Sequence, residues 1–352
     1  MFIKSFEYED LRTGWKLERA EFDAFNLLVG NSGVGKTQIL RALTNVARMA
    51  TATLAECVWS LEFHLEDRRY EWSGRVAEDV AAGQRKTLSD VNERLVQDGS
   101  TIFVRGGDAF TFHGGTLPHL SPELSGLRLL SGEASIRPLL DGFRRVLPIA
   151  EIPESPLKVP LDGRKGVNRS PSILESALAL VHTKPTTWHQ ISETFQSIFP
   201  TVEEVSVHRF TDPEDGEDTI AVRLRERSSS AVIEHREIAS GMRRTLGHLI
   251  ELAIAPKDSI ILIDEFENSL GANCMPEVVR LLNSRPDLQF IITSHHPYVI
   301  NNIPKDTWKL VQRKGSTVHV TSARDIPALQ DASHHQAYLR LVNLPEFEEG
   351  IA

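Results

Sequence analysis

Glycine, lysine and threonine occur at residues 30–37 with the spacing G-x-x-x-x-G-K-T. The apolar run at 27–29 precedes this loop and helical spacing of apolar residues follows it, so the pattern joins a buried strand to a helix. Glycines let backbone N–H groups turn inward around phosphate oxygens, and the helix start adds a partial positive charge. Lys36 can then reach the β- and γ-phosphates, and the Thr37 hydroxyl can bind Mg²⁺. The loop therefore predicts a nucleoside triphosphate site, formed by Gly30, Asn31, Ser32, Gly33, Val34, Gly35, Lys36, Thr37 and Gln38.

Two acidic residues follow the apolar stretch 260–263, which is typical of a central buried strand. Asp264 and Glu265 would then lie at the carboxyl end of that strand, where open α/β sheets place their ligands. We expect Asp264 to hold the hydration shell of Mg²⁺ and Glu265 to take a proton from the attacking water. The competing interpretation is ordinary polarity at the end of a strand.

A second apolar strand, 290–293, is followed by Ser294, His295 and His296. A histidine at the end of a neighbouring strand can hydrogen-bond the γ-phosphate or the lytic water. We assign that role to His295, although a lone histidine in such a place is more often structural. His296 is expected to pack against neighbours or face solvent.

The stretch Ser240-Gly241-Met242-Arg243-Arg244 precedes an apolar helix expected at 245–253. Ser240 and Gly241 at a helix start form an anion-binding terminus, to which Arg243 and Arg244 add charge. Alone, this pattern is more typical of an ordinary helix cap. Its position just before the acidic strand favours the anion-binding interpretation.

The elements that position these residues follow from apolar periodicity and turn residues. We expect strands at 2–7, 15–17, 25–29, 58–65, 70–72, 202–210 and 219–225, and helices at 36–50, 172–182 and 186–199. Between 77 and 160 the signal is weak, with a short apolar piece at 101–104 and helical spacing at 136–146. Neither of the helices expected at 172–199 continues as heptads, which excludes a long coiled coil there.

The chain has 352 residues and the composition of an ordinary folded protein, with a formal net charge of −9. The start of the sequence resembles a strand and carries no targeting or membrane segment, so we expect a cytoplasmic protein without a membrane partner. Cys57 and Cys274 lie far apart, which argues against a structural zinc site.

Charge alone leaves DNA binding open. The net charge is negative, which disfavours general coating of nucleic acid. Basic clusters nevertheless occur at Arg137 with Arg144-Arg145 and at Arg164-Lys165 with Arg169. Solvated loop charge is the alternative for each cluster.

The order of these motifs resembles that of the ABC-type ATPase heads of the SMC and DNA-repair group. More narrowly, it is similar to the bacterial anti-phage defence ATPases of the OLD-like, Septu, PARIS and retron-associated groups. The matching blocks cover about residues 1–50 and 200–320. The phosphate loop departs from the usual pattern, because Ser32-Gly33 replaces asparagine-glycine, and the 240–244 motif lacks the G-G-Q of transporters.

The resemblance implies a role for each matching residue. Ser240 and Gly241 would contact the γ-phosphate held by a second subunit, Glu265 would be the general base and His295 the switch histidine. Asn268-Ser269 would belong to a loop that crosses the dimer seam. ATP and Mg²⁺ are the implied cofactors.

The resemblance also implies the fold: an α/β ABC-type head with a mixed central sheet, flanking helices, an antiparallel β subdomain and an inserted, mainly helical lobe. We divide the chain into an N-terminal ATPase part at 1–76, an inserted lobe at 77–200, a C-terminal ATPase part at 201–320 and a tail at 321–352.

The leading functional hypothesis is an ATP-hydrolysing homodimer that acts as a switch for a partner effector, a nuclease or toxin, in defence against phage. Three alternatives remain: an SMC-like DNA repair or chromosome ATPase, a transporter ATP-binding subunit, and a self-contained nuclease. The coiled coil, the G-G-Q motif and the glutamine loop that the first two need are not found, and the sequence after His295 is too short for the nuclease domain of OLD proteins.

Overall fold

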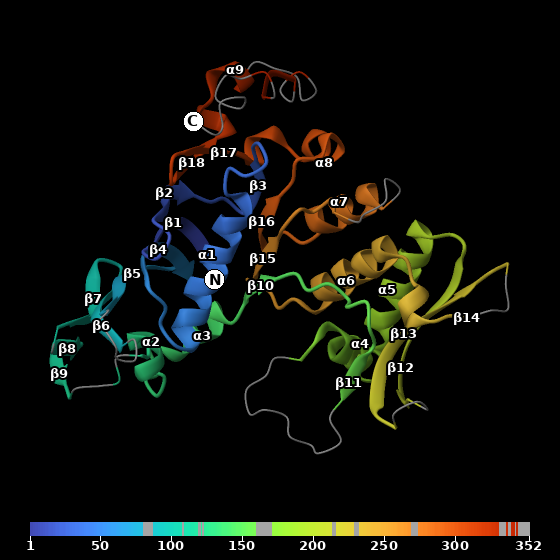
Figure 1. Cartoon of the computed structure of the whole chain (residues 1–352), viewed down its shortest axis with the longest axis horizontal. Helices are drawn as coiled ribbons and strands as arrows, with labels where there is room; N and C mark the ends of the chain where they lie inside the picture. Colours follow the sequence, from blue (N-terminus) through green and yellow to red (C-terminus); the bar gives the residue numbers. More distant parts are fainter. Residues whose placement is uncertain are drawn as a thin grey trace. The chain divides into compact units, whose positions relative to one another are not determined.

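The computed structural model describes residues 1–79, 87–107, 109–118, 121, 123–159, 171–212, 216–228, 232–268, 274–330, 336, 339–341 and 343. Contacts divide the chain into two units (Figure 1). Unit 1 contains Met1–Pro148, Pro256–Phe266 and Pro286–Ala352, whereas unit 2 contains Ile149–Ala255 and Glu267–Arg285. The predicted α/β class, with a mixed sheet and flanking helices, is confirmed.

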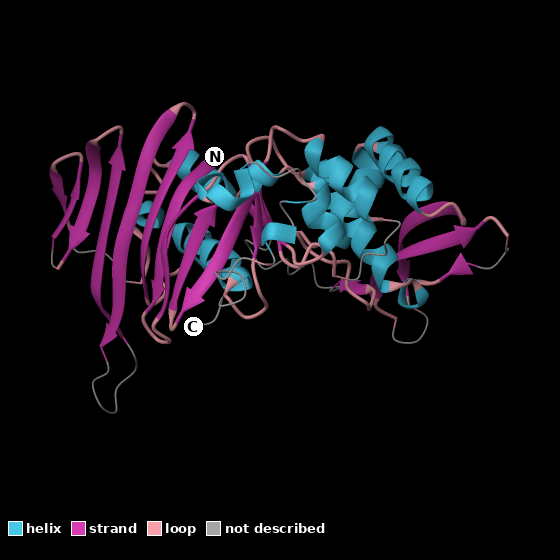
Figure 2. Cartoon of the chain, turned by 90° about the horizontal axis from the view of Figure 1, so that it is seen from above, coloured by secondary structure: helices cyan, strands magenta, loops and turns pink. Residues whose placement is uncertain are grey.

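Unit 1 is built on one large sheet, which is 14-stranded in the described part of the chain (Figure 2). Five neighbouring strands run parallel, in the order β10 (Val146–Pro148), β15 (Ile260–Ile263), β16 (Gln289–Thr293), β3 (Phe25–Val29) and β17 (Trp308–Lys314). The sheet continues through β18 (Thr317–Ser322), β2 (Trp15–Glu21), β1 (Phe2–Asp10), β4 (Cys57–Leu65), β5 (Arg68–Asp79), β6 (Thr87–Gln97), β7 (Ser100–Gly106), β8 (Ala109–Phe112) and β9 (Gly115–Leu117). In this second part only β18 and β2 pair in parallel.

The register of the parallel strands brings three chain segments to one edge of the sheet. Ile263 lies opposite Ile292, and Thr293 lies opposite Leu28. The residues that follow β15, β16 and β3 therefore emerge together at the carboxyl ends of the strands. This is the edge at which open α/β sheets bind ligands.

Helix α1 (Lys36–Thr51) follows β3 and packs on the sheet through one apolar face. Ile39, Leu43 and Val46 recur at helical spacing and are buried in the same core as strands β1 and β4. The unit also contains the helices α2 (Gly126–Leu129), α3 (Arg137–Phe143), α8 (Pro297–Asn302) and α9 (Pro327–Gln330), and the 3₁₀ turns η2 (Lys305–Thr307) and η3 (Ala323–Asp325).

The stretch after residue 77 differs from the expected inserted lobe, because β6 to β9 continue the sheet of unit 1. The sequence of β6 does not show a regular alternation of apolar and polar residues, because the charged residue Glu93 takes a core position. Glu93 is 2% exposed and accepts hydrogen bonds from Trp72 Nε1 at 3.1 Å and Gly126 N at 2.7 Å. Arg105 lies 3.6 Å from the same carboxylate. The four-segment division at 76, 200 and 320 stays a prediction.

Burial raises the pKa of Glu93 to about 7, while the Gly126 N–H, Arg105 and Trp72 act in the opposite direction. Arg105 also donates to the carbonyls of Leu124 and Ser121. The pair thus ties strands β6 and β7 to the segment that leads into α2. Removing only one partner leaves the other charge buried without compensation.

We expect Glu93→Leu to lower the free energy of unfolding by about 3–5 kcal/mol, because Arg105 keeps its buried charge. Urea denaturation measures this loss. The double variant Glu93→Leu/Arg105→Leu should recover part of it, since no unpaired charge remains. A loss below about 1 kcal/mol in the single variant, the size of a surface change, would contradict this account.

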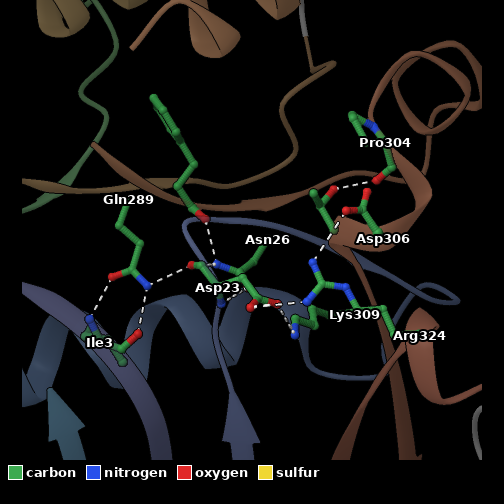
Figure 3. A network of polar contacts seen from close by, with 10 residues as sticks. Ile3, Asp23, Asn26, Gln289, Pro304, Asp306, Lys309 and Arg324 are labelled. Carbon is green, nitrogen blue, oxygen red and sulfur yellow. Dashed lines mark hydrogen bonds and ion pairs between the residues drawn. The ribbon is translucent and has the colours of Figure 1, made fainter. Parts of the chain in front are cut away.

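A polar network fixes the chain just before β3, at the opposite end from the phosphate loop (Figure 3). Asp23 forms an ion pair with Lys309 at 2.9 Å, and Lys309 is only 3% exposed. The Asp23 carboxylate also lies 3.6 Å from Arg324. The Asn26 side chain bonds to both backbone groups of Asp23 and to Phe290 O, at 2.7–3.0 Å. Gln289 bonds to both backbone groups of Ile3 and to Asp23 O. Strands β1, β3, β16 and β17 are therefore held in one register.

Unit 2 has a core of its own, formed by helices and a small antiparallel sheet. The helices are α4 (Ile173–Thr183), α5 (Pro185–Ile198), α6 (Ser240–Ile254) and α7 (Met275–Asn283), with the 3₁₀ turn η1 (His235–Glu237). The strands are β11 (Leu157–Val159), β12 (Val202–Thr211), β13 (Asp218–Glu226) and β14 (Val232–Ile233). The helices and strands expected between 172 and 225 are confirmed within a residue or two. Helix α6 begins earlier than expected, at Ser240 itself.

Cys57 and Cys274 are both buried and carry no disulfide. Among the described residues, no helix combines the length and apolar character needed to cross a membrane.

Helix α6 carries a titratable group in its last turns. Burial raises the pKa of Glu251 to about 7. The folded chain therefore binds a proton at Glu251 between pH 4.5 and 7 that the unfolded chain has released. The contribution of Glu251 to the free energy of unfolding therefore falls as pH rises through this window.

We expect Glu251→Gln to remove that loss, so that the variant gains about 2–3 kcal/mol over the wild type between pH 4.5 and pH 8. Urea denaturation at both pH values measures the gain. Glu193→Gln, at an exposed glutamate of α5, is the matched control and should gain nothing. Equal pH slopes for the wild type and Glu251→Gln would refute the assignment.

Candidate nucleotide-binding site

The loop between β3 and α1 has the backbone conformation that its glycines allow. Gly30, Gly33 and Gly35 have φ values of 153°, 85° and 108°. Residues that carry a Cβ atom rarely adopt such values. A Cβ at Gly30 would lie 2.4 Å from Val311 O, and one at Gly35 would lie 3.1 Å from Val318 Cγ2. Strands β17 and β18 therefore press directly on the loop and hold its shape.

The loop presents polar groups without a protein cap at the helix start. Gly35 is the N-cap of α1 and, having no side chain, makes no side-chain cap hydrogen bond to the helix. Lys36 Nζ donates to Gly30 O at 2.7 Å and to Asn31 O at 2.9 Å, so its amine lies over the loop. Ser32, Gly33 and Gln38 are exposed, whereas Val34 is buried beneath the loop. Uncapped N–H groups, a helix dipole and a lysine are the features that bind phosphate.

The Asp264 carboxylate joins the loop to the neighbouring strands. Thr37 Oγ1 donates to Asp264 Oδ1 at 3.0 Å, and Thr293 Oγ1 donates to the same oxygen at 2.8 Å. The sequence analysis had assigned Thr37 and Asp264 to the metal, and the structure brings the two together although 227 positions separate them. Within the described part of the chain, no group of three or more His, Cys, Asp or Glu side chains is arranged so that it could hold a metal ion by itself.

These residues fit Mg²⁺. A hydroxyl and one carboxylate are hard oxygen ligands, and Mg²⁺ is bound in proteins by one or two carboxylates together with substrate phosphates and water. Thr37 lies in the first turn of α1, directly after the phosphate loop, so a metal at this pair would adjoin the phosphates. A site with more carboxylates would instead favour metal binding without nucleotide.

Glu265 has an unusual backbone conformation. Its φ is 44°, in the left-handed region, which costs a residue with a side chain about 1–2 kcal/mol. Glu265 N donates to Thr293 Oγ1 at 2.7 Å, and Phe266 N donates to Thr293 O at 3.0 Å. The turn that follows β15 is therefore fixed to the end of β16. Its left-handed residue is the exposed Glu265, while Asp264 is half-buried.

The two histidines after β16 have different environments. His295 is exposed at the edge of the sheet. His296 Nδ1 accepts from Tyr298 N at 3.1 Å and so caps α8, which is a structural role. The buried Ser294 accepts from His296 N at 3.1 Å and fixes the turn between them.

Ser240, Gly241 and Arg243 belong to unit 2, at the first turn of α6. Ala239 is the N-cap, and its methyl side chain offers the helix no acceptor. Ser240 is exposed, and Arg243 donates to Ile238 O. Arg244 is buried and paired with Glu151, which makes it part of the support of the helix. An exposed, uncapped helix start is compatible with the expected anion-binding role.

Some sequence-based expectations concern residues outside the described part of the chain. Ser269, the basic group Arg164-Lys165-Arg169 and the centre of the acidic turn, 213–215, belong here. In the other basic cluster, Arg144 pairs with Asp141 at 2.7 Å and Arg145 donates to Lys257 O. DNA binding stays an untested expectation.

Thr293 contacts both members of the acid pair, although no sequence motif marks it as a site residue. Its signal was slight: a threonine at the end of an apolar strand, directly before Ser294 and His295. Trp15 was also missed as a neighbour of the loop, since its Nε1 would lie 3.4 Å from a Cβ at Gly35. Both contacts depend on register and could not be read from spacing.

Comparisons with known proteins agree with this site. Residues 139–301 match the family model described as "AAA domain, putative AbiEii toxin, Type IV TA system". The matched segment contains Ser240, the acid pair and His295, and the phosphate loop precedes it. A comparison with curated proteins found no match.

Among solved structures, 208 chains match. An SMC head bound to the C-winged helix domain of ScpA is 15% identical, with 92% of this chain and 97% of that chain covered and a TM-score of 0.49. The SMC head domain from Thermotoga maritima is 11% identical, with 92% and 99% covered and a TM-score of 0.45. An SMC head with an extended coiled coil, bound to the C-terminal domain of ScpA derived from Pyrococcus furiosus, is 12% identical, with 97% and 98% covered and a TM-score of 0.44.

The family match and the site lead to the same conclusion. The matched segment supplies the acid pair, and the residues before it supply a loop whose threonine hydrogen-bonds that pair. Residues 139–301 are thus similar to an AAA domain, in agreement with the resemblance to P-loop ATPases that the order of the motifs indicates.

Proposed function

We propose that this protein hydrolyses ATP between two copies of itself, and that closing and opening of the dimer control a partner effector, a nuclease or toxin, in defence against phage. The observation that carries the proposal is the hydrogen bond from Thr37 to Asp264. This bond places Thr37, which follows Lys36 in the phosphate loop, against Asp264, the first residue of the acid pair. This is the arrangement that phosphoryl transfer to water requires.

The residues divide the chemistry between them. Bound Mg²⁺, held by Thr37 and Asp264, would neutralise charge on the β- and γ-phosphates. The loop N–H groups hold the phosphates, and Lys36 exchanges its two loop carbonyls for phosphate oxygens. Glu265 is exposed at the sheet edge, from which its carboxylate can accept a proton from the attacking water. His295 donates a hydrogen bond to the γ-phosphate.

The dimer part of the proposal is supported by the start of α6. Ser240 is exposed and the N-cap side chain offers no acceptor, so the first N–H groups of this helix suit an anion. In the motif order that the chain resembles, this helix binds the γ-phosphate of the opposite copy. Hydrolysis removes that phosphate and with it the contact that favours the closed dimer.

The effector part is supported by the description of the matched family, which includes the words "putative AbiEii toxin, Type IV TA system". The described site residues suit nucleotide hydrolysis, which by itself does not damage a phage. A second activity, such as that of a nuclease or toxin, is therefore needed. We therefore infer that ATP binding by this chain controls the activity of a nuclease or toxin in a partner protein.

We expect Glu265→Gln to bind ATP as the wild type does but to hydrolyse it about 10²–10⁴-fold more slowly, because only the proton acceptor is lost. Steady-state phosphate release and fluorescent-nucleotide binding measure the two effects. Lys36→Ala is the contrasting variant and should lose binding as well. Wild-type turnover in Glu265→Gln would remove Glu265 as the base.

A mixing experiment tests whether ATP is held between two copies. Ser240→Arg and Lys36→Ala should each be inactive, the first because its helix start is blocked and the second because its phosphate loop is impaired. Equal mixtures should regain ATPase activity, since a mixed dimer contains one intact pair of loop and helix start. ATP binding by dilute Ser240→Arg should equal that of the wild type.

The matched control is Ser197→Arg, at an exposed serine of α5, which should stay active alone. Inactive mixtures, or loss of ATP binding by dilute Ser240→Arg, would show that the two motifs act within one copy.

A further inference from the structure

Thr293 ends β16 and is 1% exposed. We propose that its hydroxyl is a positioning group that sets the metal-binding carboxylate and the backbone of the general base relative to one another. The inference deepens the proposed function and rests on it for the roles of Asp264 and Glu265. It adds a buried residue that acts through its hydrogen bonds to Asp264 and Glu265.

The direction of the hydrogen bonds carries the argument. Glu265 N can only donate, so Thr293 Oγ1 accepts from it, at 2.7 Å. The hydroxyl proton is then directed to Asp264 Oδ1 at 2.8 Å. One side chain on β16 therefore contacts two successive residues that follow β15. Because Thr293 is buried, water is a poor substitute for either contact.

The contacts act on two different properties of the acid pair. On Asp264, Oδ1 accepts from both Thr37 and Thr293, which fixes the orientation of the carboxylate. On Glu265, the bond stabilises a backbone with a φ of 44°, which residues with a side chain adopt only rarely. Thr293 O also accepts from Phe266 N, so the main chain of the turn is held twice.

The ladder between β15 and β16 could not provide this order by itself. Its described pairs end at Ile263 and Ile292, one residue before Asp264 and Thr293. Beyond this point the threonine side chain continues the connection between the strands. A valine at 293 has nearly the same shape and packs equally well in a strand, but it neither accepts nor donates.

The first test uses the protein without nucleotide. In Thr293→Val, peptide hydrogen exchange over residues 264–268 should accelerate at least about tenfold, because the Glu265 N–H loses its acceptor. Thr293→Ser keeps the hydroxyl and should exchange as the wild type does. Thr219→Val is the matched control, at a buried threonine of β13 in unit 2 whose hydroxyl donates to Glu217 O.

The second test measures the link between metal and nucleotide. Thr293→Val should bind ATP in EDTA within about twofold of the wild type, because the loop is untouched. In Thr293→Val, the gain in ATP affinity on adding Mg²⁺ should fall at least about fivefold, and kcat should fall at least about tenfold. Thr293→Ser, which keeps the hydroxyl, should show the wild-type values of both. Thr219→Val should retain the wild-type metal effect and kcat.

The outcomes separate the two proposals. Unchanged exchange over 264–268 together with an unchanged Mg²⁺ effect in Thr293→Val would overturn the positioning role. A wild-type protein that binds no ATP would overturn the proposed function, and the exchange experiment would still decide whether Thr293 holds the turn. If Thr293→Val does not fold by circular dichroism, Thr293→Ala is judged by the same criteria.

Discussion

The nucleotide site depends on one carboxylate oxygen. Asp264 Oδ1 accepts from Thr37 on α1 and from Thr293 on β16, so it joins the phosphate loop, its own strand and the strand between them. Hydrogen bonds to a charged group stabilise by about 1.5–3 kcal/mol each, more than those between neutral groups. They also fix direction, and here this matters more than their strength. Without this oxygen the three strand ends would be neighbours in the sheet but not parts of one site.

A polar network at one end of β3 and close steric contacts at the other end fix the position of this contact. Before β3, Asp23 binds Lys309 and both backbone groups of Asp23 are bound by Asn26. After β3, the loop is pressed by β17 at Gly30 and by β18 at Gly35. A one-residue slip of β3 would move every side chain of the strand to the opposite face of the sheet and break the Asn26 bonds. The register that the network fixes is the register in which Thr37 meets Asp264.

The sequence predicted the parts of the site that depend on local patterns. The phosphate loop, β15 and β16 could be recognised because glycine spacing and uninterrupted apolar runs have few structural solutions. Strands β6 to β9 could not, since Glu93 and Arg105 take core positions that alternation assigns to apolar residues. The helix start at Ser240 and Gly241 was predicted, but the apolar pattern marked the helix only from Thr245, because the first turn of α6 carries polar and basic residues. Thr293 was missed because its partner is 29 residues away.

The acid pair lies next to the point where the chain passes from unit 1 into unit 2. Glu265 is followed by Phe266, the last residue of that segment of unit 1, and unit 2 resumes at Glu267. A ligand shifts a conformational equilibrium only through contacts that differ between the two states. The left-handed φ of Glu265 and the two bonds to Thr293 define one such state at the point where the chain passes into unit 2. In the proposed function, a phosphate that altered this turn would act directly on the covalent connection to the unit that carries Ser240. Coupling through a long series of packed side chains would then not be required.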